Sequence, residues 1–422
     1  MNLHRLLPQL AAVLIPSLAL FHPATVSDPQ LRTVTPPPIA SKRPFRMLVL
    51  GDSVMWGQGL TNDNKFSYRL KNWICRQRNS GTCPTADDVE IYVEAHSGAV
   101  VAQPRKPHEK EIEQRFLRTN APVRFDGEVN FGYPTIWGEV DLARRHYEAA
   151  AIAREEIDLI IVNGGINDIG APNILLPLLG GNLDKLARKY SEQEMRLLLD
   201  KLADTFPNAR IIVPGYFPLV SVCTPENIIL ETVGYFFLHQ KERANSEIAK
   251  DPAPPRCDVN ARVSHILKSL ANRSVQWTAA SNASLAAAVA SFNSAHSTLP
   301  VSTSNGQTGP PAASMRALFI AIPFKEENAY AASNSFLWKL VPKPANTVFE
   351  CAEHDPLKKL MVNDEIQSKR PCKCDQAGKG NDIACVRAAT FHPNIQGAGA
   401  YYDAISSQLE KIWPFTSWAA GN

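Results

Sequence analysis

The stretch Phe45-Arg-Met-Leu-Val-Leu-Gly-Asp-Ser53 is a short apolar run that ends in a glycine and two polar residues. A continuous apolar run of this length, closed by a glycine, predicts a buried strand that leads into a turn. Strands without polar alternation are typical of parallel sheets that are covered on both faces. We therefore expect Ser53 to follow the carboxyl end of a first strand, where the sites of such sheets lie.

Strands and helices alternate along the rest of the chain. Ser191 and Glu194 have the spacing of a capping box and predict the start of one helix. The predicted strands cover 45–50, 89–93, 157–162, 209–213 and 318–322, and the predicted helices begin near 66, 140, 191, 278 and 401. Strands that alternate with helices imply an α/β fold with a mostly parallel sheet covered on both faces.

The N-terminal residues resemble an export signal. His4 and Arg5 precede an apolar stretch from Leu10 to Phe21 that is short for a bilayer span. We interpret residues 1–27 as a signal peptide, with an uncleaved anchor as the alternative, and expect no stable membrane span. Residues 28–44, rich in proline, serine and threonine, resemble a linker. The predicted location is therefore secreted or periplasmic.

The chain has eight cysteines. An even number of cysteines behind an export signal predicts disulfides, which form in the oxidising environment outside the cytoplasm. Proximity in sequence suggests the pairs Cys75–Cys83 and Cys223–Cys257, with Cys351, Cys372, Cys374 and Cys385 paired among themselves. A metal site that includes His354 and the last four cysteines is the alternative. The C-x-C spacing of Cys372 and Cys374 is not the usual zinc spacing, so we favour disulfides.

The net charge of the chain does not favour a polyanionic partner. The net charge is only +3 over 422 residues. Such a small charge gives no reason to propose a nucleic acid or an anionic membrane surface as the partner.

Four short motifs occur in chain order. They are Gly51-Asp52-Ser53, Ser97-Gly98, Gly165-Ile166-Asn167-Asp168 and His392-Pro393-Asn394. Each has a structural alternative: a helix N-cap at the serine, turns at the glycine and asparagine, and a helix entry at the histidine. A Gly-Asp-Ser tripeptide alone is expected in roughly one chain in ten of this length. The order of the four motifs makes the set specific.

With these motifs the sequence resembles the SGNH, or GDSL-type, hydrolase superfamily over most of residues 45–413. The resemblance implies a three-layer α/β/α, flavodoxin-like fold. It implies that Ser53 is the nucleophile and that His392 is the catalytic base. The Ser53 amide, the Gly98 amide and the Asn167 side chain would form the oxyanion hole. No metal or organic cofactor is implied.

The chemistry of these residue types agrees with the resemblance. A serine hydroxyl needs an adjacent base to act as a nucleophile, and a histidine can take its proton and later return it. Each oxyanion-hole donor contributes about 10²–10³ in rate. We therefore predict a serine esterase that hydrolyses a lipid, acetylated-sugar or small ester through an acyl-enzyme. The alternative is a non-catalytic secreted binding protein that retains the fold.

The third member of the expected triad is missing. The family has an aspartate three residues before its histidine, and here that residue is Ala389, before His392. Two solutions are open: a backbone carbonyl that holds the ring, which gives a serine–histidine dyad, or a carboxylate from the preceding segment, with Asp382, Asp355 and Glu353 as candidates. We favour the dyad, because no candidate has the family spacing.

The predicted catalytic domain covers 45–413. We expect insertions near 103–135, 224–256 and 341–386, and a C-terminal tail over 414–422. We interpret His96 and His354 as structural or surface histidines, and Trp338 as a core residue rather than part of an acyl pocket.

Overall fold

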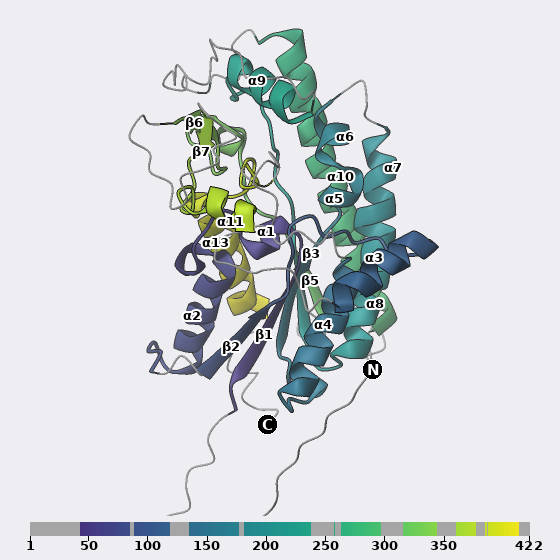
Figure 1. Cartoon of the computed structure of the whole chain (residues 1–422). Helices are drawn as coiled ribbons and strands as arrows, with labels where there is room; N and C mark the ends of the chain where they lie inside the picture. The colour runs from purple at the N-terminus through teal and green to yellow at the C-terminus, as the bar shows by residue number, and fades with distance from the viewer. Residues whose placement is uncertain are drawn as a thin grey trace, which may run out of the picture. The chain divides into compact units, whose positions relative to one another are not determined.

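Five parallel strands form the central sheet of the protein (Figure 1). The computed structural model describes residues 43–84, 88–118, 135–176, 181–237, 257, 263–296, 315–343, 360–376, 385 and 387–412. The strands are β1 (Phe45–Gly51), β2 (Val89–Val93), β3 (Leu159–Asn163), β4 (Arg210–Pro214) and β5 (Ala317–Ile320). The strand order β2-β1-β3-β4-β5 is the flavodoxin-like order of a doubly wound sheet. The predicted strands are confirmed, with ends that differ by at most two residues.

β1 and β3 are neighbours in the sheet, and every one of their residues is buried. The register pairs Gly51 at the end of β1 with Asn163 at the end of β3, so both strands stop at the same edge. At Gly51, φ is +123° and a Cβ would lie 2.2 Å from the carbonyl oxygen of Asn163. Only glycine fits this backbone conformation and this close approach. The turn into Ser53 therefore depends on the glycine before it.

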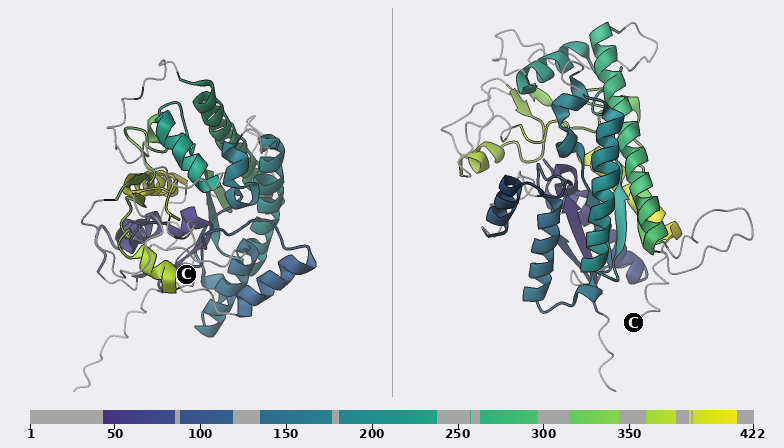
Figure 2. Two further views of the ribbon diagram at one scale, coloured as in Figure 1. Left: turned by 45° about the horizontal axis from the view of Figure 1, so that its top comes forward. Right: turned by 90° about the vertical axis from the view of Figure 1, so that its right-hand side faces the viewer.

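Helices cover both faces of the sheet (Figures 1 and 2). On one face, α2 (Phe66–Arg78) packs against α13 (Ile395–Ile412). On the other face, α8 (Met195–Thr205) packs between α4 (Ile136–Ala149) and the long α10 (His265–His296). The predicted three-layer α/β/α fold is therefore confirmed.

Shorter elements complete the described chain. The helices are α1 (Ser53–Trp56), α3 (Pro107–Arg118), α5 (Ile166–Ile169), α6 (Ala171–Leu175), α7 (Leu183–Ala187), α9 (Glu226–Phe237) and α11 (Arg370–Gln376), with 3-10 turns η1 (Asn62–Asn64), η3 (Arg154–Glu156) and η7 (Glu326–Asn328). An antiparallel pair of strands is formed by β6 (Leu340–Pro342) and β7 (Leu360–Val362). Of the segments predicted as insertions, 103–135 contains α3, 224–256 contains α9, and 341–386 contains β7 and α11.

The predicted helix start at Ser191 is wrong. The helix begins with α7 at Leu183, where the side chain of Asn182 accepts a backbone N–H of the first turn. It continues through a π-helical stretch, η4 (Arg188–Glu194), into α8. Ser191 is fully buried inside this helix, and its Oγ lies 2.8 Å from the position that a Cβ on Gly165 would take. The serine is small because it packs against the loop after β3, and its spacing to Glu194 has no capping role.

Disulfides join cysteines that lie close together in sequence. The pairs are Cys75–Cys83, Cys223–Cys257 and Cys374–Cys385. The first two were predicted individually, and the third lies within the predicted C-terminal group. Because Cys374 and Cys385 are bonded to each other, neither offers a thiolate to a metal. These disulfides fit a protein exported to an oxidising compartment.

Several predictions fall outside the described residues. These are the signal peptide over 1–27, the linker up to residue 42 and the tail over 414–422. Within the ranges that are described, no helix combines the length and the apolar character needed to cross a bilayer.

Replacement of Gly51 by alanine should destabilise the fold more than the same change at Gly81. Both residues have positive φ, +123° and +93°, but a Cβ on Gly81 would meet nothing within 4 Å. Gly81→Ala should therefore cost only the backbone strain, about 1–2 kcal/mol. Gly51→Ala should cost at least about 2 kcal/mol more, because β1 and β3 must also separate. Urea unfolding of both variants measures the difference in the free energy of unfolding. Equal losses of stability would contradict the close approach of Gly51 to the Asn163 carbonyl.

Candidate active site

Ser53 lies at the first residue of α1, directly after β1. Asp52 caps this short helix, and its Oδ1 accepts a hydrogen bond from the Val54 amide at 2.9 Å. Ser53 is buried, and its hydroxyl oxygen lies 2.6 Å from Nε2 of His392. The structure therefore brings together the first and last motifs of the sequence as a hydrogen-bonded serine–histidine pair.

The backbone holds the imidazole of His392 in one tautomer. Nδ1 lies 3.1 Å from the carbonyl oxygen of Thr390, which can only accept a hydrogen bond. Nδ1 must therefore carry the proton and donate it, which leaves Nε2 as the acceptor for the Ser53 hydroxyl. Burial lowers the pKa of His392 to about 4, so the ring is neutral at neutral pH.

The turn that presents His392 is paired with a neighbouring loop. The Trp338 amide donates to the His392 carbonyl at 2.8 Å, and the Phe391 amide donates to the Trp338 carbonyl at 3.2 Å. Phe391 has a φ of +68°, a conformation that a bulky residue adopts only where its surroundings impose it. Trp338 is buried in the core, as predicted. The backbone of the turn at Phe391 and His392 is thus held by its pairing with Trp338.

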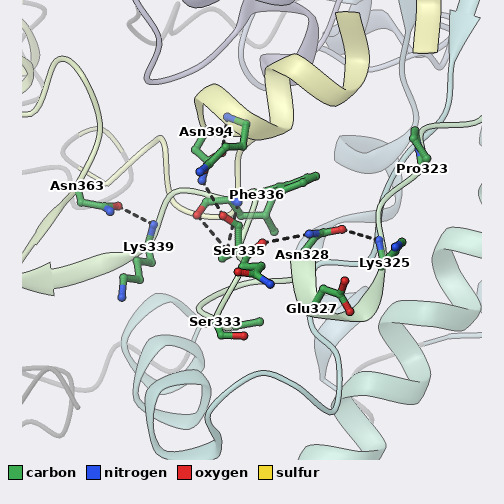
Figure 3. A pocket seen from close by; sticks show the side chains of 14 residues that line it. Pro323, Lys325, Glu327, Asn328, Ser333, Ser335, Phe336, Lys339, Asn363 and Asn394 are labelled. Atoms are coloured by element: carbon green, nitrogen blue, oxygen red, sulfur yellow. Dashed lines mark hydrogen bonds between the residues drawn. The ribbon is translucent and has the colours of Figure 1, made fainter. Parts of the chain in front are cut away.

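A cavity of about 590 Å³ adjoins this loop (Figure 3). Its asparagine side chains are engaged with the backbone: Asn394 Nδ2 donates to the Ser335 carbonyl at 2.9 Å, and Asn328 accepts from the Lys325 amide at 2.8 Å. Figure 3 shows the Asn394 side chain, beside the yellow helix, pointing toward Ser335 and Phe336. Neither member of the serine–histidine pair lines the cavity. Of these amides, the one of Asn394 links the segment that follows His392 to the loop at Ser335.

The second motif is anchored to the first by a buried glutamate. The His96 amide donates to the Gly51 carbonyl at 2.8 Å. Glu139, on α4, accepts from the Gly51 amide at 2.7 Å and lies 3.2 Å from Nδ1 of His96. His96 and Glu139 are fully buried, so of the two alternatives for His96, structural or surface, the structure supports the structural one. It fixes the strand ends that precede Ser53 and Gly98.

The third motif shapes the loop that carries Gly98, whose φ is +84°. Asn167 donates from Nδ2 to the Ala99 carbonyl at 2.9 Å. The carboxylate of Asp168 accepts from the Val101 amide at 2.9 Å and from the next amide at 3.0 Å. Burial raises the pKa of Asp168 to about 6, although these donors oppose the shift. Asn167 is therefore bonded to the residue directly after Gly98, which places the two oxyanion-hole candidates close together.

Tyr216 is a residue of the site that sequence reasoning missed. Its hydroxyl donates to Asp52 Oδ2 at 2.6 Å and accepts from the Ile166 amide at 3.3 Å. Burial raises the pKa of Asp52 to about 6 and raises that of Tyr216 well above its usual value. The tyrosine thus joins the first and third motifs. Its position just after β4, at the same edge of the sheet, was the available signal.

The acid expected before His392 is absent, as the sequence states. Ala389 is completely buried. The three candidate carboxylates, Asp382, Asp355 and Glu353, lie outside the described residues. In the part of the chain that is described, the partner of Nδ1 is the Thr390 carbonyl. In that same part, no cluster of three or more His, Cys, Asp or Glu side chains is arranged to hold a metal ion.

Comparison with known proteins finds similarity in structure. No protein-family model and no curated protein sequence matches the chain. A lipase from Streptomyces rimosus is 12% identical, with a TM-score of 0.38. A phospholipase A1 from Streptomyces albidoflavus is 10% identical, with a TM-score of 0.36. Each of these two matches covers 86% of this chain and 99% of the other protein. A family two carbohydrate esterase from Clostridium thermocellum is 9% identical with a TM-score of 0.32, covering 88% of this chain and 66% of the other.

The fold is established by the features of the chain itself. The parallel sheet has the flavodoxin-like order, and helices cover both of its faces. Hydrogen bonds beside the ends of its strands join Ser53 to His392, and they join Asp52 through Tyr216 to Ile166. The second motif is linked to the first and third through its flanking residues, His96 and Ala99. The chain therefore has a three-layer α/β/α fold with a flavodoxin-like strand order, as predicted.

Proposed function

We propose that this protein is a serine esterase that hydrolyses carboxylic esters through an acyl-enzyme. The observation that carries the proposal is the 2.6 Å hydrogen bond from the Ser53 hydroxyl to Nε2 of His392, at the edge where open α/β sheets bind their ligands. The bond from Nδ1 of His392 to the Thr390 carbonyl supports it, since Nε2 is then the basic nitrogen. A nucleophile, a base and a group that orients the base are the parts that acyl transfer requires.

In the acylation step, Ser53 Oγ attacks the ester carbonyl carbon while its proton moves to Nε2 of His392. The carbonyl oxygen becomes an oxyanion and the histidine becomes an imidazolium. When the tetrahedral intermediate collapses, the bond to the alcohol oxygen breaks and the alcohol leaves with the proton from Nε2. The acyl group remains on Ser53 and His392 is neutral again.

The deacylation step uses the same groups with water as the nucleophile. His392 takes a proton from water, the resulting hydroxide attacks the acyl carbon, and the proton returns to Ser53 Oγ as the acid leaves. One ester and one water are consumed, and one alcohol and one acid are formed. His392 must be neutral at the start of each step, which agrees with the direction of its pKa shift.

The oxyanion would be held by the Ser53 amide, the Gly98 amide and the Asn167 side chain. An amide nitrogen carries two hydrogens, and the one hydrogen bond from Asn167 in the described part of the chain goes to the Ala99 carbonyl. The second hydrogen is then available to the oxyanion. Because Asp168 and Tyr216 fix the surrounding backbone, the donors need little reorganisation during the reaction.

The proposed substrate is a small-molecule, lipid or acetylated-sugar ester, and the proposed location is outside the cytoplasm. The competing proposal is a non-catalytic secreted binding protein that keeps the fold. The observation in its favour is the buried Ala389 in place of an acid. The two proposals separate on one point, since only the esterase turns over p-nitrophenyl esters of graded chain length.

Ser53→Ala should abolish turnover of p-nitrophenyl esters, because it removes the oxygen that His392 activates. The loss should reach about 10⁴-fold or more in kcat. Ser294→Ala, at an exposed serine on α10, is the matched control and should retain wild-type rates. Turnover in Ser53→Ala comparable to that of the wild type, with unchanged circular dichroism, would refute the proposal.

Asn167→Ala should lower kcat by about 10²–10³ and change KM little, because its free N–H acts mainly on the oxyanion. Steady-state kinetics on one ester measures both constants. Asn208→Ala is the control, since that asparagine is exposed beside the amino end of β4, away from the site. A rise in KM alone would make Asn167 a ground-state binding residue instead.

The acid limb of kcat/KM should have its midpoint well below 6.5. His392 is the base only when neutral, and burial lowers its pKa to about 4, so activity should persist down to acidic pH and fail as the ring is protonated. The profile is measured alongside circular dichroism, which shows the range where the protein stays folded. A midpoint near 6 that disappears in Asp52→Asn would assign the limb to Asp52, whose pKa is about 6, and contradict the prediction.

A further inference from the structure

Gln58 lies in the turn that follows α1, and it is only 1% exposed. The turn is closed by two hydrogen bonds to the Ser53 carbonyl, one from the Gly57 amide and one from the Gln58 amide, each at 3.1 Å. The next residue, Gly59, packs closely against Ala389, because a Cβ on the glycine would lie 2.7 Å from the alanine Cβ. The backbone of Gln58 is therefore fixed relative to the peptide of the proposed nucleophile.

The side chain of Gln58 reaches the second motif. Its Oε1 accepts a hydrogen bond from the Ser97 hydroxyl at 2.7 Å, and Ser97 is buried as well. A buried hydroxyl that loses its hydrogen-bond partner is costly, so this bond strongly favours one placement of Ser97. Gln58 thus bonds Ser53 through its backbone, and it bonds the residue before Gly98 through its side chain.

Ser97 and Gly98 are the two central residues of a tight turn. The Ala99 amide donates to the His96 carbonyl at 3.1 Å across this turn, and φ is positive at Gly98, +84°, but not at Ser97. This combination defines a type II turn, which differs from a type I turn chiefly by a rotation of the central peptide. The N–H of that peptide is the Gly98 amide, a proposed oxyanion donor. The direction of the donor therefore depends on which turn the segment adopts.

Groups on both sides of this central peptide hold it in place. The Ser97 side chain is bonded to Gln58 on one side, and the Ala99 carbonyl is bonded to Asn167 on the other. Oxyanion donors are most effective when they are aimed before the reaction, because no reorganisation is then needed as charge develops. Gln58 is therefore placed to keep the Gly98 amide aimed from the moment that a substrate binds.

We propose that Gln58 is a positioning residue that couples the nucleophile to the oxyanion hole. The proposal rests on the proposed esterase function. The backbone amide of Gln58 bonds the Ser53 carbonyl, and its side chain keeps the turn at Ser97 and Gly98 in the type II arrangement. Gln58 acts through these residues and takes no part in proton transfer. The tetrahedral intermediate then meets a donor that is already directed at its oxyanion.

Removal of the bond from either side should slow the chemical step. Gln58→Met keeps the length of the side chain but lacks the acceptor, and Ser97→Ala lacks the donor. Each should lower kcat on a p-nitrophenyl ester by about 10- to 100-fold, less than the loss of a whole oxyanion donor, with KM little changed. The double variant should lie within about threefold of the slower single variant, because both changes break one bond. Losses that multiply would show two independent effects and overturn the proposal.

A trifluoromethyl ketone tests the direction of the donor without turnover. Such a ketone adds the serine hydroxyl and places a tetrahedral oxyanion in the hole, so it resembles the transition state. Its inhibition constant should rise in Gln58→Met by about the factor by which kcat/KM falls. The acid limb of kcat/KM should stay at the wild-type pH, since His392 is unchanged. An unchanged inhibition constant, or a loss that lies entirely in KM, would contradict a role in the oxyanion hole.

Thr205→Val is the matched control. Thr205 and Ser97 are both 9% exposed, and the Thr205 hydroxyl bonds the Lys201 carbonyl at 2.7 Å at the end of α8. β4 begins shortly after this end, so Thr205 lies at the opposite edge of the sheet from the site. Its kcat and inhibition constant should equal those of the wild type, and urea unfolding measures the stability that each variant loses. A loss of kcat as large as that of Ser97→Ala would assign the effect to stability and overturn the proposal.

If Gln58→Met does not fold, Ser97→Ala decides, because it removes the same bond and leaves the turn after α1 unchanged. A kcat at least about tenfold below that of the wild type, with a matching rise in the inhibition constant, supports the proposal, and a wild-type kcat overturns it. The wild-type protein is assayed first with the same ester. Absence of wild-type turnover would refute the esterase and this role with it, whereas turnover that neither variant lowers would refute only the role of Gln58.

Discussion

The hydrogen bond between Ser53 Oγ and His392 Nε2 joins residues that are 339 positions apart in the chain. The rest of the structure has to place these two atoms within 2.6 Å. β1 delivers the serine to the carboxyl edge of the sheet, and α13 begins three residues after the histidine. α13 packs against α2, which follows the serine turn on the same face of the sheet. The packing of these two helices therefore sets the distance on which the proposed chemistry depends.

Buried polar groups then make this edge of the sheet rigid. Glu139, Asp168 and Tyr216 each bond backbone amides from a different segment of the chain. Such groups are unfavourable in the interior unless they are paired, so their bonds specify one arrangement of the loops. Preorganised donors are most effective where charge develops in a dry site. The same network that fixes the fold at the strand ends thus supplies the rigidity that an oxyanion hole needs.

Much of the fold was predictable from the sequence, because apolar runs such as 45–50 and 157–162 carry the signal of buried strands on their own. The four motifs were predictable because the proposed chemistry needs particular residue types, a serine, a glycine, an asparagine and a histidine, which the sequence displays directly. The helix start predicted at Ser191 was wrong, because Ser191 is a small residue buried against Gly165 that happens to have capping-box spacing to Glu194. The contact between Thr390 and His392 could not be predicted from the sequence, because Thr390 acts through its backbone carbonyl and every residue has one. The bond between Gln58 and Ser97 could not be predicted either, because only packing brings their two turns together.

The central claim is that His392, oriented by a backbone carbonyl, activates Ser53. Labelling of the wild-type protein with a fluorophosphonate, followed by mass spectrometry of the modified peptide, tests it most directly. We predict one modified residue, Ser53, and a labelling rate at least about 10³-fold slower in His392→Ala. Labelling at another serine, an unreactive wild-type protein, or equal rates in the two proteins would contradict it.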